Sequence, residues 1–262
     1  MTEQSQENRP DVSGTAGTGS AQQAGSSATW KNGAMIRLRQ ITRVYQEGSL
    51  EVLALRGVDL DVAEGEFTAL AGPSGSGKTT LLNIIGVLDH PTSGRVEVAG
   101  KDIGQLRKGD AADFRLANVG FIFQAYNLVP VLTAYENAEF TLLLRGVPAP
   151  ERKDRVMPLL ERVGLGDMKD RKPHELSGGQ QQRIAVVRAL ATQPAIILAD
   201  EPTANLDSDT SAGLLDLMQE LNQELRTTFL FSTHDPVVIE RARRVVRLLD
   251  GRVAGTESLA AD

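Results

Sequence analysis

A glycine-rich loop constrains the fold of this chain more than any other stretch of its sequence. The loop reads Gly72-Pro73-Ser74-Gly75-Ser76-Gly77-Lys78-Thr79. It fits the pattern G-x-x-x-x-G-K-[ST], in which glycines let the backbone turn sharply and bring its N–H groups against phosphate oxygens. Residues 67–71 before it predict a short buried strand, and residues 80–85 after it predict a helix whose N-terminus favours an anion. The flanking strand and helix favour a nucleoside triphosphate site over a flexible glycine turn.

The residues at the end of this loop are expected to carry its chemistry. Lys78 should reach the β- and γ-phosphates as a counter-charge, and the Thr79 hydroxyl should ligate Mg²⁺. The other loop residues and Thr80, the next residue along the chain, should contact the nucleotide through the backbone. The loop therefore predicts ATP and Mg²⁺ as the cofactors.

The composition limits the classes of protein to consider. The chain has 262 residues, of which 41% are hydrophobic, enough for one large α/β domain or two small ones. Its net charge of -6 argues against a general nucleic-acid surface, which needs clustered basic residues. It contains no cysteine, which excludes disulfides, thiolate metal sites and a cysteine nucleophile. No apolar run is long enough to span a bilayer and no secretory signal pattern is present, so we expect a cytosolic protein.

The pattern along the chain predicts a disordered tail followed by one α/β domain. Residues 1–33 contain almost no large apolar side chains, which is typical of a solvated tail. Residues 34–262 alternate predicted strands with helices, which implies a mostly parallel sheet. A helical stretch at about 126–187 is inserted into this core, with two of its helices separated by Pro148 and Pro150. The expected strands are residues 36–41, 52–62 (interrupted at Arg56-Gly57), 67–71, 95–98, 119–123, 195–199, 228–233 and 245–249.

Polar side chains follow three of these expected strands. Asp200 and Glu201 come after the apolar run at 195–199, and carboxylates at the carboxyl end of a buried strand face the ligand crevice of an open α/β sheet. We expect Asp200 to hold Mg²⁺ through water and Glu201 to deprotonate the attacking water; the alternative is a solvated surface pair. Gln124 is expected to touch Mg²⁺ or this water, unless it is only a polar strand terminator. His234 is placed to hydrogen-bond the γ-phosphate.

Two further features suggest contacts with the nucleotide. The segment Leu176–Gln180 contains a hydroxyl and two consecutive glycines before an expected helix, which builds an anion site useful only against a second subunit's γ-phosphate. The alternative is a capped helix start, since Ser177 is a good N-cap residue. Tyr45 is expected to stack on adenine, with burial in the core as the alternative.

With these residues in place, the chain resembles the ATP-binding cassette ATPases over about residues 35–255. The corresponding motifs are Walker A at Gly72–Thr79, the Q-loop at Gln124, the signature at Leu176–Gln180, Walker B at Ile196–Glu201, the D-loop at Ala204–Asp207 and the switch histidine at His234. The resemblance implies that Ser177, Gly179 and Gln180 bind the nucleotide of the opposite subunit, and it adds Asp207 to the nucleotide-binding residues.

The resemblance also implies a fold and partners. The expected fold is a P-loop NTPase with a RecA-like core, an antiparallel β subdomain and a helical subdomain at 126–187. Two such subunits are expected to form a head-to-tail dimer with ATP at the interface. A narrower resemblance to the lipoprotein-release and macrolide-export branch implies an ATPase that powers a separate membrane permease from its inner face, for export or extraction of a lipoprotein, peptide or drug-like substrate.

Besides transport, two other roles are known for proteins with an ATP-binding cassette. A cell-division ATPase that signals through a permease-like partner resembles the same branch, so a regulatory function stays open. ABC proteins that act on ribosomes or DNA carry two cassettes or a long coiled coil. This chain has one cassette and no heptad run, which argues against that class.

Overall fold

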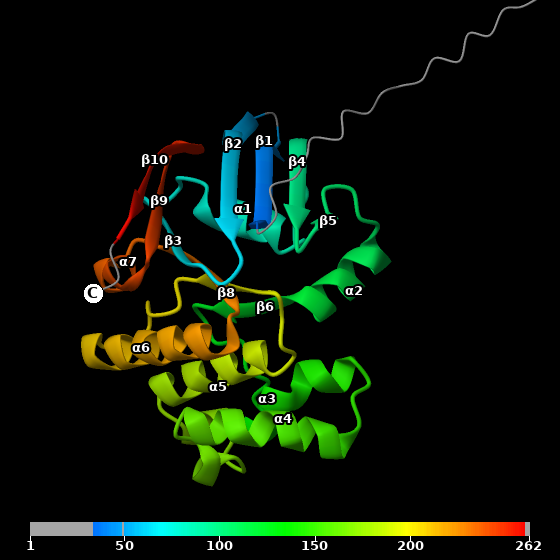
Figure 1. Cartoon of the computed structure of the whole chain (residues 1–262), viewed down its shortest axis with the longest axis vertical. Helices are drawn as coiled ribbons and strands as arrows, with labels where there is room; N and C mark the ends of the chain where they lie inside the picture. The colour runs from blue at the N-terminus through cyan, green and yellow to red at the C-terminus, as the bar shows by residue number, and fades with distance from the viewer. Residues whose placement is uncertain (1–33, 49, 260–262) are drawn as a thin grey trace, which may run out of the picture. The chain divides into compact units, whose positions relative to one another are not determined.

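A six-stranded sheet forms the centre of the fold (Figure 1). The computed structural model describes residues 34–48 and 50–259, so the tail predicted at 1–33 lies outside the described residues. The sheet has the order β10-β9-β3-β8-β7-β6, and only β10 is antiparallel to its neighbour. Its strands are β3 (Phe67–Ala71), β6 (Val119–Phe123), β7 (Ile196–Asp200), β8 (Thr228–Thr233), β9 (Arg244–Leu249) and β10 (Arg252–Ser258).

The register of this sheet brings four strand ends together. Every residue of β3 and β8 is buried, as expected for parallel strands covered on both faces. Ala71 lies opposite Thr233, and Asp200 lies opposite both Ser232 and Phe123. The carboxyl ends of β3, β6, β7 and β8 therefore meet at one edge, and the polar residues that follow them share that edge.

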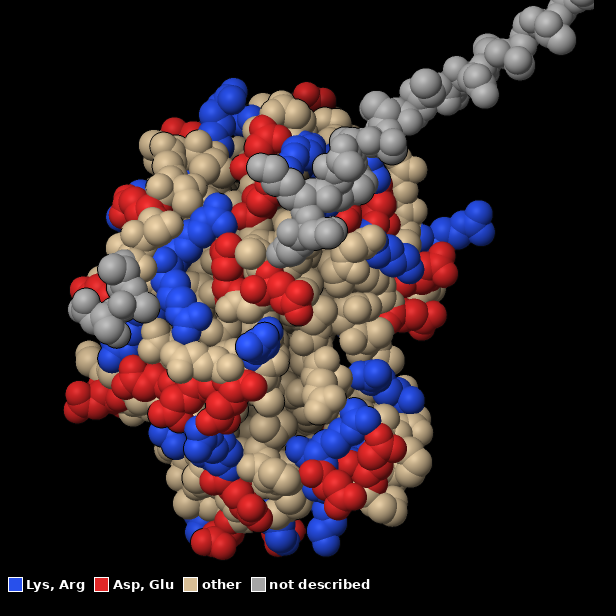
Figure 2. Space-filling model, in the orientation of Figure 1, with Lys and Arg blue, Asp and Glu red and all other residues tan. Residues whose placement is uncertain are grey.

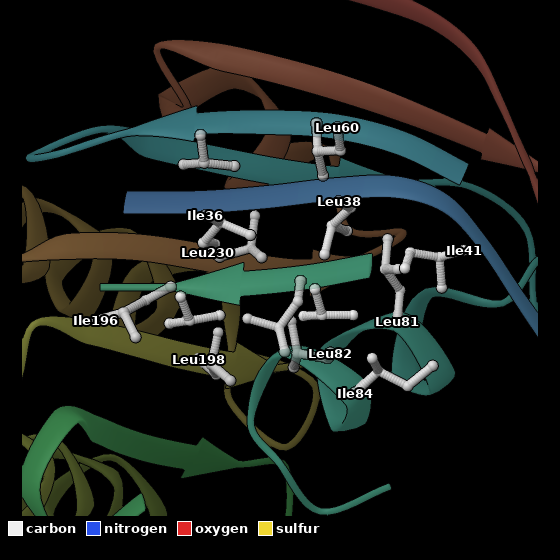
Figure 3. Packing of buried hydrophobic residues seen from close by; sticks show 14 of the residues in the cluster. Ile36, Leu38, Ile41, Leu60, Leu81, Leu82, Ile84, Ile196, Leu198 and Leu230 are labelled. Carbon is white, nitrogen blue, oxygen red and sulfur yellow. The ribbon is translucent and has the colours of Figure 1, made fainter. Parts of the chain in front are cut away.

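A second, antiparallel sheet has the order β2-β1-β4-β5. Its strands are β1 (Ala34–Glu47), β2 (Leu50–Ala63), β4 (Ser93–Val98) and β5 (Lys101–Asp102). The interruption expected at Arg56-Gly57 is a bulge rather than a break: β2 is continuous, but Gly57 (φ of 78°) is skipped where the pairing with β1 passes from Val58 to Arg56. Apolar residues of this sheet pack on helix α1 (Lys78–Ile85) and on the central sheet (Figure 3). That packing places the β1–β2 hairpin beside the glycine-rich loop.

Helices connect and cover the sheets. Helices α3 (Ala134–Leu144), α4 (Ala149–Arg162) and α5 (Gly178–Leu190) contact one another around an apolar core of their own and lie together in Figure 1. Pro150 lies in the first turn of α4, where its missing N–H costs nothing. The remaining helices are α2 (Lys108–Asn118), α6 (Ser208–Leu225), α7 (Pro236–Arg241) and the 3-10 turns Gly166–Met168 and Pro173–Glu175. The sequence patterns predict none of α2, α6, α7, β5 and β10.

Charged residues on the surface include a band along α6. Figure 2 shows acidic side chains gathered there, where the sequence of α6 supplies Asp209, Asp216, Glu220 and Glu224. Arg162 of α4 pairs with Glu220 at 3.3 Å and with Glu224, which links the three-helix unit to the core. Such exposed pairs contribute little to stability, so the apolar cores hold the fold together. None of the helices in the described part of the chain is long and apolar enough to cross a bilayer.

Candidate nucleotide site

A cavity of about 450 Å³ opens at the edge where the four strand ends meet. It brings together most of the residues predicted to contact phosphate, Mg²⁺ or the attacking water. Its lining consists of Val52, Leu53, Ala54, Ser74, Gly75, Gly77, Lys78, Thr79, Thr80, Gln124, Asp200, Glu201 and His234. The predicted site residues that lie outside this lining are Tyr45, Gly72, Pro73, Ser76, Ser177, Gly179, Gln180 and Asp207.

The glycine-rich loop has its shape because side chains would not fit in it. Gly77 is the N-cap of α1 with φ of 99°, a conformation that favours glycine, and a Cβ there would lie 2.8 Å from the carbonyl oxygen of Ala54. A Cβ at Gly72 would overlap the carbonyl oxygen of Leu248. The loop is therefore wedged between β2 and the end of β9, with the N-terminus of α1 directed toward the cavity.

Lys78 is held inside the loop by the loop itself. Its side chain is 7% exposed, and its ammonium donates hydrogen bonds to the carbonyl oxygens of Gly72 (2.8 Å) and Pro73 (3.0 Å). An ammonium has three N–H donors, so these two bonds orient Lys78 and leave one donor for an anion. The next residue, Thr79, donates from its hydroxyl to Asp200 at 3.3 Å. Two of the three residues predicted to contact Mg²⁺, Thr79 at the start of α1 and Asp200 at the end of β7, thus lie together.

Glu201 lines the cavity and is held at both carboxylate oxygens. Thr233 donates its hydroxyl to Oε2 at 3.0 Å, and Nδ1 of His234 lies 2.7 Å from Oε1. The backbone N–H of Glu201 donates to Ser232, and φ of 46° places this residue in the left-handed region. Such strain in a non-glycine residue is characteristic of functional sites. The Glu201 side chain is 17% exposed and that of His234 is 71% exposed, so both are accessible from the cavity.

Gln124 extends into the cavity from the end of β6, and its backbone connects to the D-loop. The carbonyl oxygen of Gln124 accepts a hydrogen bond from the Asn205 side chain at 2.8 Å. The hydroxyl of Tyr126 donates to the Asn205 carbonyl at 3.4 Å. These contacts join segments about eighty residues apart; sequence reasoning included Asn205 in the D-loop motif without predicting this contact, and it did not single out Tyr126.

Arg188 of α5 stabilises an unusual backbone just after Gln124. Tyr126 and Asn127 have φ of 55° and 51°, a left-handed pair without glycine. The guanidinium of Arg188 donates to the carbonyl oxygens of Tyr126 (2.8 Å) and Asn127 (2.5 Å). Desolvation by burial lowers the pKa of Arg188 from its ordinary value. The helix that begins at the signature segment thereby holds the segment that begins at Gln124.

The signature segment forms the N-terminus of α5. Ser177 accepts a hydrogen bond from the Gln180 N–H at 3.3 Å, and the Gln180 side chain accepts one from the Ser177 N–H at 2.9 Å. This capping box matches the alternative of a capped helix start, yet it satisfies only one of the free N–H groups of the helix itself. A Cβ at Gly178 would lie 2.8 Å from the Tyr126 hydroxyl, and one at Gly179 would lie 2.5 Å from the Thr210 methyl group. Both glycines are therefore required by contacts within the same chain.

Asp207 and Tyr45 each have a partner within the chain. Asp207 is the N-cap of α6; hydrogen bonds from the backbone N–H and the hydroxyl of Thr210 lower the pKa of its carboxyl. Tyr45 is half-buried, and its hydroxyl donates to Asp89 at 2.7 Å. Tyr45 lies directly opposite Val52 in the β1–β2 ladder, and Val52 lines the cavity. Tyr45 is thus one strand away from the cavity lining.

Sequence reasoning also missed residues whose roles depend on packing. Thr233 precedes the predicted His234 at a strand end, and that position alone was a usable signal. Nothing in the local pattern marks Val52, Leu53 and Ala54 as cavity residues, because the hairpin that carries them reaches the loop only through the packing of the two sheets.

Comparisons with known proteins agree with this geometry. The family model described as ABC transporter matches residues 55–204. An ABC transporter ATP-binding protein of Thermotoga maritima is 47% identical over 85% of this chain and 95% of its own length. The lipoprotein-releasing system ATP-binding protein LolD of Anaeromyxobacter dehalogenans is 47% identical over 83% of this chain and 92% of its own. A macrolide export ATP-binding/permease protein MacB of Paracoccus denitrificans is 47% identical over 84% of this chain, which spans only 33% of that protein.

Solved structures of similar chains show the same fold. The dimeric ABC transporter cassette MJ0796 matches with a TM-score of 0.80 and 42% identity, over 87% of this chain and 100% of that one. A second dimeric structure of MJ0796, in a post-hydrolysis state bound to ADP and Pi, matches with a TM-score of 0.79 and 41% identity. The expected P-loop fold is confirmed, and the chain belongs to the ATP-binding proteins of the ABC transporter family.

Proposed function

We propose that this chain binds MgATP in the cavity at the strand ends, hydrolyses it in a dimer, and thereby powers a separate membrane permease. The single observation that carries the site assignment is that residues distant in the sequence come together around one cavity. The glycine-rich loop, Gln124, Asp200, Glu201 and His234 follow four different strands yet line one cavity. A phosphate-binding loop, a possible base and a candidate metal ligand in one place are the parts that phosphoryl transfer to water needs.

The residues at the cavity fit Mg²⁺ as a companion of ATP. Thr79 and Asp200 offer a hydroxyl and a carboxylate oxygen 3.3 Å apart, both hard donors that suit Mg²⁺. The described residues contain no group of three or more His, Cys, Asp or Glu side chains placed to hold a metal. Magnesium typically keeps several waters and completes its shell with substrate phosphates. We infer that Thr79, Asp200 and Gln124 would hold the ion, which would polarise the γ-phosphate when bound.

The protein groups around the γ-phosphate have different roles in binding and hydrolysis. The N–H groups of the loop and the free donor of Lys78 stabilise negative charge on the phosphates. Glu201 accepts the proton of the attacking water, because its carboxylate is oriented by Thr233 and His234. His234, whose ring is largely exposed, hydrogen-bonds the γ-phosphate. The left-handed backbone of Glu201 fixes its side chain at the end of β7.

The second copy completes this site. The signature segment lies outside the cavity of its own chain, and the first-turn N–H groups of α5, apart from that of Gln180, which Ser177 caps, can bind an anion. We infer that Ser177, Gly179 and Gln180 bind the γ-phosphate held by the partner, and that Asp207 contributes from the same face. The dimeric structures of the MJ0796 cassette support this arrangement.

A groove on this chain, next to the Q-loop, is suited to docking of a permease segment. A mainly apolar cavity of about 270 Å³ is formed by β6, α3 and α5, and its lining includes Phe123, Asn127, Leu144 and Arg188. Leu144 is 60% exposed, although it is a large apolar side chain. Because Arg188 also holds the backbone after Gln124, a permease segment in this groove would bear directly on the Q-loop.

The relatives indicate the class of transport. One is named for lipoprotein release and one for macrolide export, and neither is named for cell division. We therefore favour export or extraction of a lipoprotein, peptide or drug-like molecule over the regulatory alternative. The chain would act on the inner face of the membrane, attached through its permease.

The decisive experiment is nucleotide binding and phosphate release by a Lys78→Ala variant. Losing a charge-assisted contact with phosphate should weaken MgATP binding at least about tenfold and abolish measurable turnover. Lys153→Ala, an exposed lysine on α4, is the matched control and should behave as wild type. Turnover of Lys78→Ala equal to that of the control would refute the site.

A further inference from the structure

The side chains of Arg43, Tyr45 and Asp89 contact one another outside the cavity lining. The Tyr45 hydroxyl donates to Oδ2 of Asp89 at 2.7 Å, and Arg43 pairs with Oδ1 of the same carboxylate at 2.7 Å. The guanidinium of Arg43 lies over the Tyr45 ring, 4.4 Å from its centroid. The ring is therefore fixed at its hydroxyl and covered by a cation, and both restraints depend on Asp89.

Asp89 connects this cluster to the phosphate-binding loop. The N–H of Asp89 donates to Asn83, a residue of α1, the helix that begins at Lys78. Tyr45 lies on β1 opposite Val52, and directly opposed residues of an antiparallel pair share one face of the sheet. Since Val52 lines the cavity, Tyr45 is on the cavity side of the hairpin. Asp89 thus connects Tyr45, through its carboxylate, to α1, through its backbone N–H.

The cluster has a cost that favours a functional reading. The Nε atom of Arg43 is buried and has no hydrogen-bond partner among the described residues. Burying an N–H without a partner is unfavourable, and such groups are rare enough in native proteins to need an explanation. A cation held over an aromatic ring at this cost limits the orientations of the ring.

We propose that Asp89 is a positioning residue for recognition of the adenine base. It fixes the Tyr45 hydroxyl and places Arg43 against the ring, so that Tyr45 is presented to the base in one orientation before the nucleotide arrives. This inference rests on the proposed function, in which Tyr45 stacks on adenine. Its physical basis is preorganisation: a ring already immobilised loses less conformational freedom on binding.

The test compares MgATP with Mg-triphosphate, which carries phosphates but no base, by isothermal titration calorimetry. Asp89→Ala should weaken ATP binding about two- to tenfold, the cost of immobilising one side chain, and leave triphosphate binding unchanged. Tyr45→Phe, which keeps the ring but removes the hydroxyl, should do the same. The double variant should be no weaker than Asp89→Ala alone, because Asp89→Ala already breaks the contact that Tyr45→Phe removes. In steady-state assays KM for ATP should rise while kcat is retained.

Two further variants control for general effects. Asp61→Ala breaks the exposed pair between Asp61 and Arg39 (2.7 Å) on the same sheet, and should leave both affinities unchanged. Asp89→Asn keeps an oxygen that accepts from the Tyr45 hydroxyl, so it should restore ATP affinity to within about twofold of wild type. Absence of this rescue would show that Asp89 acts on folding rather than on the ring, and would overturn the inference.

The remaining outcomes separate the inference from the proposed function. If Tyr45→Ala weakens ATP binding while Asp89→Ala does not, the stacking role stands and the positioning role is wrong. If Tyr45→Ala binds ATP as wild type does, the stacking role itself is wrong, and the inference falls with it. If Asp89→Ala weakens triphosphate as much as ATP, Asp89 acts on the phosphate loop through α1, which also overturns the inference.

Discussion

Asn137 is a buried side chain that organises the connection between the Q-loop and the three-helix unit. It is 0% exposed, and its Oδ1 accepts from the Val129 N–H at 2.7 Å. Its Nδ2 donates to the carbonyl oxygens of Val129 (3.1 Å), Leu132 (3.1 Å) and Thr133 (3.0 Å). These partners lie in the loop that leads from Gln124 to α3, and this side chain satisfies much of that loop's polar backbone.

The structure gives the size of the effect of removing this side chain. The amide has two N–H donors for its three carbonyl partners, so at most about three full hydrogen bonds are made, counting the one it accepts. At a net 0.5–1.5 kcal/mol each, Asn137→Ala should lower the free energy of unfolding by about 2–4 kcal/mol, since the Val129 N–H is left without its acceptor. ATP turnover should fall with it, because the loop carries the Q-loop backbone.

Asn137→Asp tests the donors separately, because it keeps the shape and the acceptor. The introduced carboxylate would face three carbonyl oxygens, so burial and these dipoles raise its pKa in the folded state above the unfolded value. A raised folded pKa means that stability is greatest at low pH and is lost as pH rises through that pKa. The variant should therefore be less stable at pH 8 than at pH 5, relative to wild type.

The assay is urea unfolding followed by circular dichroism at both pH values. The matched control is Asn118→Asp, since Asn118 is half-buried and makes one hydrogen bond, to Phe114 at 3.0 Å. The free energy of unfolding of Asn118→Asp should fall by less than about 1 kcal/mol relative to wild type, with little difference between the two pH values. An Asn137→Asp variant that loses no more than this control, or shows no dependence on pH, would refute the reasoning about the amide donors.

Two further substitutions test the catalytic roles. Glu201→Gln should keep ATP binding but lower turnover by about 10²- to 10⁴-fold, because a carboxamide does not accept the water's proton. Measuring ATP binding and phosphate release on one preparation checks this. Full activity of the variant would show that Glu201 is not the base. Gly178→Asp should leave ATP binding by the monomer unchanged, because Gly178 lies outside the cavity. It should abolish turnover, because a side chain there meets Tyr126 and brings a negative charge to the site shared with the partner. Turnover equal to wild type in a phosphate-release assay would show that the signature segment does not act on the partner's nucleotide.

Part of the site was predictable because its signals are local. The glycine-rich loop depends on backbone conformation and on the next helix, and both are encoded within about twenty residues. Asp200, Glu201 and His234 directly follow apolar strands, and parallel strands with buried faces bring their carboxyl ends to one edge of a sheet. The pattern of strand, polar end and helix therefore predicted the α/β class and the residues that converge at the cavity.

Other contacts depend on segments that meet only after packing. Asn205 reaches the backbone of Gln124, Arg188 holds the left-handed Tyr126, and Asp89 holds Tyr45, although none of these pairs is close in sequence. A single polar residue in a loop has no periodicity, so no local pattern distinguishes a structural partner from a solvated side chain.

The sequence by itself thus determined the fold class and the polar residues that meet at the strand ends, because short-range spacing sets backbone conformation and burial. Only the tertiary structure decided which other segments of the chain lie against these strand-end residues and the phosphate loop. It placed the β1–β2 hairpin beside the phosphate loop and the start of α5 against Tyr126 and Thr210. The physical reason is that these placements follow from the packing of three apolar cores, which sums many contacts between residues distant in sequence.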